Sequence, residues 1–149
     1  MQKCEDCAAT YYPLIGRILI AVLFIAAGYE KLMDVINNHG AYTIMAMNSV
    51  GIPFAGMTLL ILTIVLELLG GIMLVVGYKT KWTGIVLALF TIVATYYFHF
   101  SKDQLLMALK NLSIIGGLLY VSGFGAGVWS VDSWFAKRKQ TGMTEKAMM

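Results

Sequence analysis

The stretch ALKNLSIIGGLLYVSG, residues 108–123, decides the fold class of this chain. It is almost wholly apolar and supplies most of the ~20 residues that a helix needs to cross a bilayer. It also contains Lys110 and Asn111 near its start. A lysine inside a membrane helix costs about 2.5–3.5 kcal/mol on insertion scales. We therefore expect a membrane helix whose lysine faces a polar interior.

The composition of the whole chain agrees with a membrane protein. Of its 149 residues, 59% are hydrophobic and only 13% are charged, whereas soluble domains carry about 25% charged residues. The length allows one domain with a few spans. The net charge of +3 does not indicate nucleic acid binding, because most basic residues flank apolar runs, where they orient membrane helices.

Four apolar runs have the length of membrane-spanning helices. They cover residues of about 14–33, 54–77, 82–100 and 105–124. The sequence therefore predicts an all-α membrane protein, a four transmembrane helix bundle.

The remaining segments are short. We expect a tail over residues 1–13, a single membrane domain over 14–136 that ends in a short C-terminal interfacial helix, and a basic tail over 137–149. The long connection, 34–53, contains the turn signals NNHG and GIP. The residues between these signals, 41–50, predict a short helix at the membrane surface.

Lysine and arginine predict the orientation. Four spans place both termini and residues 78–81 on one side of the membrane. That side collects Lys3, Lys79, Lys81, Lys137, Arg138, Lys139 and Lys146. Because positive residues favour cytoplasmic segments, we expect both termini in the cytoplasm. A cleaved signal peptide is the alternative for the N-terminus, but the first apolar run is long and contains Arg17.

Two segments indicate a weak internal repeat. ELLGGIMLVVG, residues 67–77, aligns with SIIGGLLYVSG, residues 113–123, and all three glycines match. This pattern is typical of two pseudo-repeated helical hairpins related by an axis along the membrane normal. The alternative is that glycine is simply frequent in membrane helices.

Helical spacing places the ionisable residues on stripes with small residues. Such stripes usually face the interior of a bundle. The four predicted inward stripes are Arg17, Ala21, Phe24, Gly28 and Lys31; Glu67, Gly70, Gly71 and Leu74; Gly84, Ala88, Thr95 and His99; and Lys110, Ser113, Gly117 and Tyr120.

Depth in the membrane predicts a partner for the buried lysine. Lys110 lies ~9 Å and Glu67 ~16 Å below the outer ends of their helices, at 1.5 Å per residue. Long side chains can bridge that offset, so we expect Glu67 to pair with Lys110. The candidate ligand-binding residues of this outer half are Lys31, Glu67, His99, Lys110 and Asn111. The alternative is that this polar cluster only locks the helices together.

Two further features lie outside this polar cluster. Arg17 lies in the inner half of the first span, where it can reach headgroups or pair with Asp132. Cys4 and Cys7 form a CxxC motif, a candidate redox pair. The two acidic residues between them disfavour the thiolate. A single CxxC lacks the second half of a zinc site, so no metal site is predicted.

These residues together resemble the DoxX family of small four-helix bacterial membrane proteins. The matching pieces are Arg17 with GYEKL (28–32), ELLGG (67–71), His99, KNLSIIGGLL (110–119) and GAGVWSVD (125–132). The resemblance covers roughly residues 14–132, and the CEDC motif lies outside it.

The resemblance implies a bacterial inner membrane protein associated with sulfur and thiol redox chemistry, as a subunit linked to a quinone oxidoreductase. No cofactor follows from the residues alone, but His99, Lys110 and Asn111 offer donors to the carbonyls of a quinone. Two alternatives stay open. One is a protein that binds lipids or small molecules without catalysis. The other is a scaffold whose cytoplasmic face, with Trp134, Phe135 and residues 137–139, recruits soluble redox enzymes. A homo-oligomer is also compatible with the sequence.

Overall fold

The computed structural model describes the backbone of residues 2–52, 54–99 and 104–147. Side chains are described for residues 10–52, 54–98, 104–141 and 143, so those of Cys4, Cys7 and His99 lie outside the described part. Its elements are all helices: α1 Gln2–Asn38, α2 Ala41–Ser49, α3 Met57–Val76, α4 Thr80–His99, α5 Leu105–Phe124 and α6 Val131–Ala147. The predicted all-α fold class is confirmed, and α1, α3, α4 and α5 are long and apolar enough to span a membrane.

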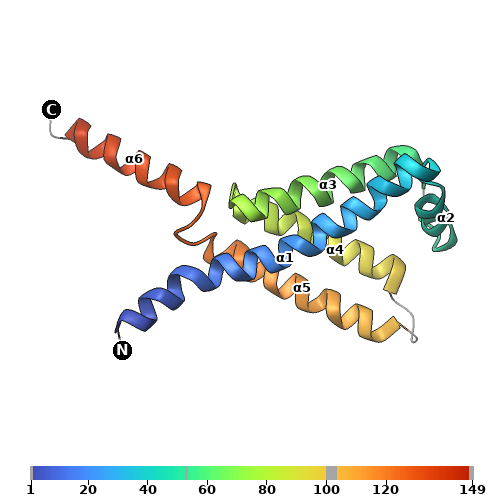
Figure 1. Ribbon diagram of the computed structural model, residues 1–149, viewed down its shortest axis with the longest axis horizontal. Helices are drawn as coiled ribbons and strands as arrows, with labels where there is room; N and C mark the ends of the chain where they lie inside the picture. Colours follow the sequence, from blue (N-terminus) through green and yellow to red (C-terminus); the bar gives the residue numbers. More distant parts are fainter. Residues whose placement is uncertain (1, 53, 100–103, 148–149) are drawn as a thin grey trace.

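The spanning helices are arranged as two pairs. α1 packs chiefly against α3, and α4 packs chiefly against α5. Figure 1 shows the two pairs close together near the chain termini and diverging toward the end that carries α2. The arrangement agrees with two hairpins, while the pseudo-repeat within them stays a prediction.

The predicted boundaries differ from the observed ones mainly in α1. Its predicted span, 14–33, is shorter than α1 at both ends, because α1 includes much of the predicted tail and continues to Asn38. No glycine occurs before Gly16 or between Gly28 and Gly40, and Pro13 lies inside the helix without ending it. The helix stops where His39 and Gly40 take positive φ angles of 54° and 73°, which reverse the chain direction.

The predicted short helix within the 34–53 connection is present as α2. Asp34, on α1, holds its start: the Asp34 carboxylate accepts from the Thr43 backbone N–H at 2.9 Å and from the Thr43 hydroxyl at 2.7 Å. Met47 of α2 packs on Leu60 and Ile64 of α3, so α2 covers that end of the bundle.

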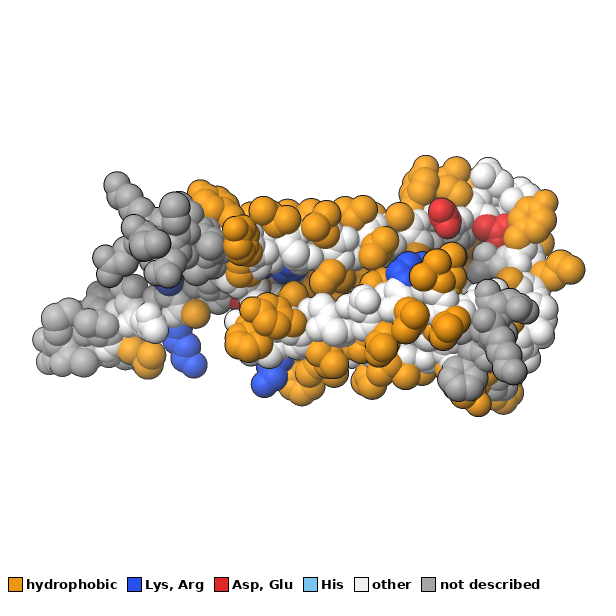
Figure 2. Space-filling model, turned by 90° about the horizontal axis from the view of Figure 1, so that it is seen from below, with side chains coloured by type: hydrophobic (Ala, Val, Ile, Leu, Met, Phe, Trp, Pro, Cys, Tyr) orange, Lys and Arg blue, Asp and Glu red, His pale blue; other side chains and the backbone are white. Residues whose placement is uncertain are grey.

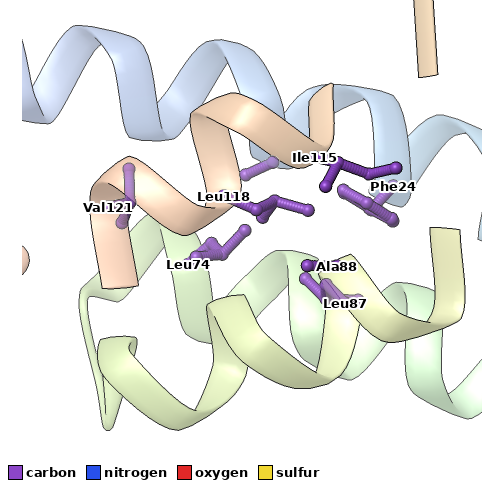
Figure 3. Packing of buried hydrophobic residues seen from close by; sticks show 8 residues of the cluster. Phe24, Leu74, Leu87, Ala88, Ile115, Leu118 and Val121 are labelled. Carbon is purple, nitrogen blue, oxygen red and sulfur yellow. The ribbon is translucent and has the colours of Figure 1, made fainter. Parts of the chain in front are cut away.

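The main apolar core lies where all four spanning helices meet. Figure 3 shows its side chains pointing toward one another from α1, α3, α4 and α5. Glycine brings the helices close: a Cβ at Gly71 would lie 3.3 Å from the Ala21 carbonyl oxygen, and one at Gly84 would lie 3.0 Å from that of Leu118. Close backbone approach of this kind is typical of packing in lipid.

The outer faces of the bundle are apolar. Figure 2 shows hydrophobic side chains along the length of the face it presents. Exposed leucine, isoleucine and valine side chains occur on all four spanning helices. Such a surface suits a lipid environment, because hydrocarbon rather than water surrounds these side chains.

The predicted inward stripes hold for three helices and fail for one. On α1, Arg17, Ala21, Phe24 and Gly28 are buried, and the stripes of α3 and α4 also face inward at Glu67, Gly71, Gly84 and Ala88. The α5 stripe is wrong: Lys110, Ser113 and Tyr120 are exposed. The buried face of α5 instead carries Ile115, Leu118, Val121 and Ser122. α5 is apolar on several sides, so its spacing does not single out one face.

α6 follows the bundle as a separate helix. It runs through the predicted basic tail as far as Ala147 and extends away from the bundle (Figure 1). Its predicted position at the membrane surface stays a prediction.

Candidate functional site

A cavity of about 540 Å³ opens between the two helix pairs, on the side of the bundle that carries α2. Ligand pockets in proteins usually measure about 300–1,000 Å³. Its walls are mainly aliphatic and aromatic, with Phe24, Phe90, Tyr97 and Phe98 among them. The polar side chains that line it are Lys31, Thr43, Thr63, Glu67, Thr91, Lys110 and Asn111.

A buried ion pair forms one wall of the cavity. The Lys31 ammonium nitrogen lies 2.8 Å from each carboxylate oxygen of Glu67 and also donates to the Ala27 carbonyl at 3.3 Å. Gly28 lets α1 approach α3 at this level, because a Cβ there would lie 3.1 Å from the Glu67 Cβ. Glu67 is only 4% exposed. An isolated charge at this depth would be costly, so the two charges depend on each other.

The predicted partner of Glu67 is therefore wrong: the carboxylate pairs with Lys31 rather than with Lys110. Depth along the helices was a correct reason to place the lysines and Glu67 in one region, but it does not say which helices touch. α3 packs on α1, which carries Lys31, while α5 packs on α4. Lys110 instead lines the cavity from the opposite side and is largely exposed.

Within the described part of the chain, the Lys110 ammonium is a donor without a partner. Among the described side chains and backbone groups, none forms a hydrogen bond or ion pair with it. The next residue, Asn111, donates one amide hydrogen to the Thr95 hydroxyl at 2.9 Å. That leaves the Lys110 ammonium and the second amide hydrogen of Asn111 on the same wall.

The structure thus brings four of the five predicted ligand-binding residues to one cavity: Lys31, Glu67, Lys110 and Asn111. The His99 side chain is outside the described part. Sequence reasoning missed Thr63 and Thr91. Thr91 lies three residues after Ala88 on the predicted inward face of α4, so helical spacing gave a signal for it. Its hydroxyl donates to the Leu87 carbonyl at 2.7 Å.

Arg17 organises the opposite end of the bundle. Its guanidinium donates to the carbonyls of Ala126, Val75 at 3.1 Å and Trp129 at 2.8 Å. Of the two alternatives for Arg17, the ion pair with Asp132 is wrong, because in the described structure the guanidinium contacts backbone carbonyls instead. The helix end at Val75 and the turn at 125–130 leave carbonyls unpaired, and the fork of donors in arginine satisfies several at once.

Asp132 instead holds the start of α4. Its carboxylate accepts from the backbone N–H groups of Lys79 at 2.7 Å and Thr80 at 2.8 Å. The Asp132 backbone N–H donates to the Gly77 carbonyl at 3.0 Å. Arg17 and Asp132 therefore fix the segment GAGVWSVD against the α3–α4 turn, which supports a structural role for both.

The sequence model of the DoxX family matches residues 12–100, more than half of the chain. The chain belongs to the DoxX family. The match includes α1 from Tyr12, α2, α3 and α4 through His99, so it contains the Lys31–Glu67 pair and Arg17.

This DoxX protein is similar to several curated proteins. It is 35% identical over 141 residues to the inner membrane protein YqjF of Escherichia coli, covering 93% of this chain and 99% of that protein. It is 28% identical over 127 residues to the inner membrane protein YphA of the same organism, covering 80% and 86%. Together, these relatives and the four apolar helices show that this chain is a multi-pass inner membrane protein.

A eukaryotic protein is also similar to this DoxX chain. The ER-derived vesicles protein ERV29 of Saccharomyces cerevisiae is 33% identical over 136 residues, covering 86% of this chain but 35% of the yeast protein. No solved structure matches the chain.

Proposed function

We propose that this DoxX protein is a ligand-binding membrane subunit of a redox system, and that its cavity holds a quinone or a similar lipid. The observation that carries the proposal is the combination of apolar walls with Lys110, a cation that has no partner among the described residues. Aromatic and aliphatic side chains suit a ring and an isoprenoid or acyl tail. Lys110 and Asn111 suit a polar head with acceptor oxygens.

The hydrogen bonds support separate roles for the two lysines. The Lys31 ammonium donates hydrogen bonds to both Glu67 carboxylate oxygens and to the Ala27 carbonyl. It therefore has no hydrogen left for a ligand, since an ammonium has three. No described group accepts from Lys110, so its three ammonium hydrogens are available to a ligand. Asn111 has one amide hydrogen available, because the other is donated to Thr95. A quinone carbonyl would accept from these two residues, while the tail lies along Phe90 and Phe98.

Glu67 is the carboxylate of the cavity lining. If the bound quinone is reduced by a partner enzyme, each ring takes up two electrons and two protons. Glu67 would then pass those protons to the ring one at a time. In this proposal the partner enzyme supplies the electrons.

The proposal is tested by titrating the purified chain with a short-chain quinone. Lys110→Met should weaken binding at least tenfold, because the ligand loses a charged donor in an apolar site worth about 1.5–3 kcal/mol. Lys81→Met is the matched control, since Lys81 is exposed outside the cavity, and it should bind as the parent chain does. Equal affinity of the parent, Lys110→Met and Lys81→Met chains would contradict the proposal.

The scaffold function is the second candidate, and α6 favours it. α6 extends from the bundle with Trp134 and Phe135 more than half exposed. The Arg138 guanidinium carbon lies 4.8 Å from the centre of the Trp134 ring. An exposed aromatic and basic helix of this kind suits a soluble partner. Loss of a redox partner on deletion of α6, with no quinone bound by the intact chain, would favour this function.

A further inference from the structure

A second hollow lies outside the cavity, on the membrane-facing side of the seam between α3 and α4. It is a groove of about 360 Å³. We propose that this groove binds one acyl chain of an anionic phospholipid, with the phosphate of that lipid at Lys79. The groove is lined by Leu62, Val65, Leu66, Leu69, Gly70 and Met73 of α3, by Trp82, Thr83, Val86 and Leu87 of α4, and by Lys79 between them.

The shape of the groove suits a lipid tail from one leaflet. From Leu62 to Met73 it follows twelve residues of α3, and the eleven steps between them span ~16 Å at 1.5 Å per residue. That length is about half of the ~30 Å hydrocarbon core of a bilayer. Leu87 lies against Gly70 at the floor of the groove, where a Cβ at Gly70 would come within 2.8 Å of the Leu87 side chain.

The charge at one end of the groove selects the headgroup. Lys79 lines that end, and its ammonium lies 5.8 Å from the centre of the Tyr78 ring. The nearby Asp132 carboxylate accepts from the backbone N–H groups of Lys79 and Thr80. Among the described residues it forms no ion pair with the Lys79 ammonium. Lys81 adds a second exposed cation two residues later.

An aromatic residue marks the interface at the same level. Trp82 is 67% exposed and lines the groove beside Lys79. Tryptophan favours the headgroup layer, where its ring is in contact with both lipid and water. The groove therefore has the order that a phospholipid requires: a cation and an aromatic ring at the headgroup level and an apolar channel below them. Among the described side chains, no acidic one lines it.

Native mass spectrometry tests the proposal with the full chain, offered equal amounts of phosphatidylglycerol and phosphatidylcholine. The parent chain should retain phosphatidylglycerol preferentially. Lys79→Gln should reduce that preference about fivefold, the contribution of one lysine near a membrane surface. Lys139→Gln, on α6, is the matched charge control and should keep the preference.

A second variant fills the groove without removing charge. Val65 lines the groove but not the cavity, whereas Leu62 and Leu66 line both. Val65→Trp should abolish retention of both lipids, while Ile72→Trp, an exposed α3 position outside the groove, should not. Val86→Trp repeats the test from α4 if Val65→Trp fails to assemble.

Two results would overturn the proposal. One is unchanged phosphatidylglycerol retention in both Lys79→Gln and the groove-filling variants. The other is a change of oligomeric state in the groove-filling variants with no change in bound lipid, which would show that a second copy covers the groove. Quinone binding by the cavity is measured separately, so failure of one site leaves the other testable.

Discussion

At the scale of single residues, the Lys31–Glu67 ion pair forms one wall of the cavity. Lys31→Met leaves the Glu67 carboxylate buried without a partner, and we expect a loss of about 3–5 kcal/mol in the free energy of unfolding. Glu67→Gln should also destabilise the chain, and the double variant should recover much of the loss. Reversible unfolding of the three variants in detergent, analysed as a double-mutant cycle, measures the coupling.

Lys110→Met gives the control for that cycle. It should add its effect to that of Glu67→Gln without coupling, since Lys110 and Glu67 do not touch in the described structure. A strong coupling between Glu67 and Lys110, with none between Glu67 and Lys31, would contradict the observed pairing.

The residues of the site were predictable, but their partners were not. Helical spacing placed Arg17, Lys31 and Glu67 on inward faces, because small residues one turn away share those faces. Which lysine reaches Glu67 depends on the contact between α1 and α3, and Gly28 makes that contact close. A single sequence gives the depth of each side chain but not the distance between helices.

At the scale of elements, the α3–α4 turn is tightly constrained by its neighbours. Gly77 has a φ angle of 69°, and a Cβ there would come within 2.6 Å of the Ser130 Cβ and closer still to the Arg17 guanidinium. Gly77→Ala should lower stability by about 1–2 kcal/mol from the left-handed backbone alone, with the clash adding to it. Thermal unfolding of the purified chain measures the loss.

Gly116→Ala is the matched control for the turn. A Cβ at Gly116 meets nothing within 4 Å, and alanine in a helix interior is favoured over glycine by roughly 0.5–1 kcal/mol. We expect a neutral or slightly stabilising effect. Equal losses at Gly77 and Gly116 would show that the turn geometry is not what matters.

The sequence predicted where the helices begin and end better than it predicted which face of each helix is buried. The run 105–124 matches α5 at both ends, because hydropathy and the bilayer thickness together set its length. Its inward face was mispredicted since Lys110, Ser113 and Tyr120 share a stripe with Gly117. In lipid, an exposed face is also apolar, so polarity alone does not distinguish the two sides of a membrane helix.

At the scale of the whole molecule, both termini lie at the end of the bundle opposite α2 (Figure 1). The excess of lysine and arginine at that end predicts that it is cytoplasmic. A C-terminal fusion to a reporter active only outside the cytoplasm should be silent. The same reporter inserted in α2 after Asn48, which is exposed, should be active. An active C-terminal reporter and a silent reporter in α2 would contradict the predicted orientation.

The central claim is that the cavity between the helix pairs holds a quinone or a similar lipid, and mass spectrometry of the gently extracted protein tests it most directly. Ala27 lines the cavity, whereas its neighbour Ala26 is exposed on the outer face of α1. The parent chain and Ala26→Phe should release the same quinone or isoprenoid lipid on denaturation. Ala27→Phe should release none, with Ala94→Phe as the second cavity-filling variant. Equal amounts of that molecule from the parent, Ala26→Phe and both cavity-filling variants would show that it binds elsewhere and would contradict the account.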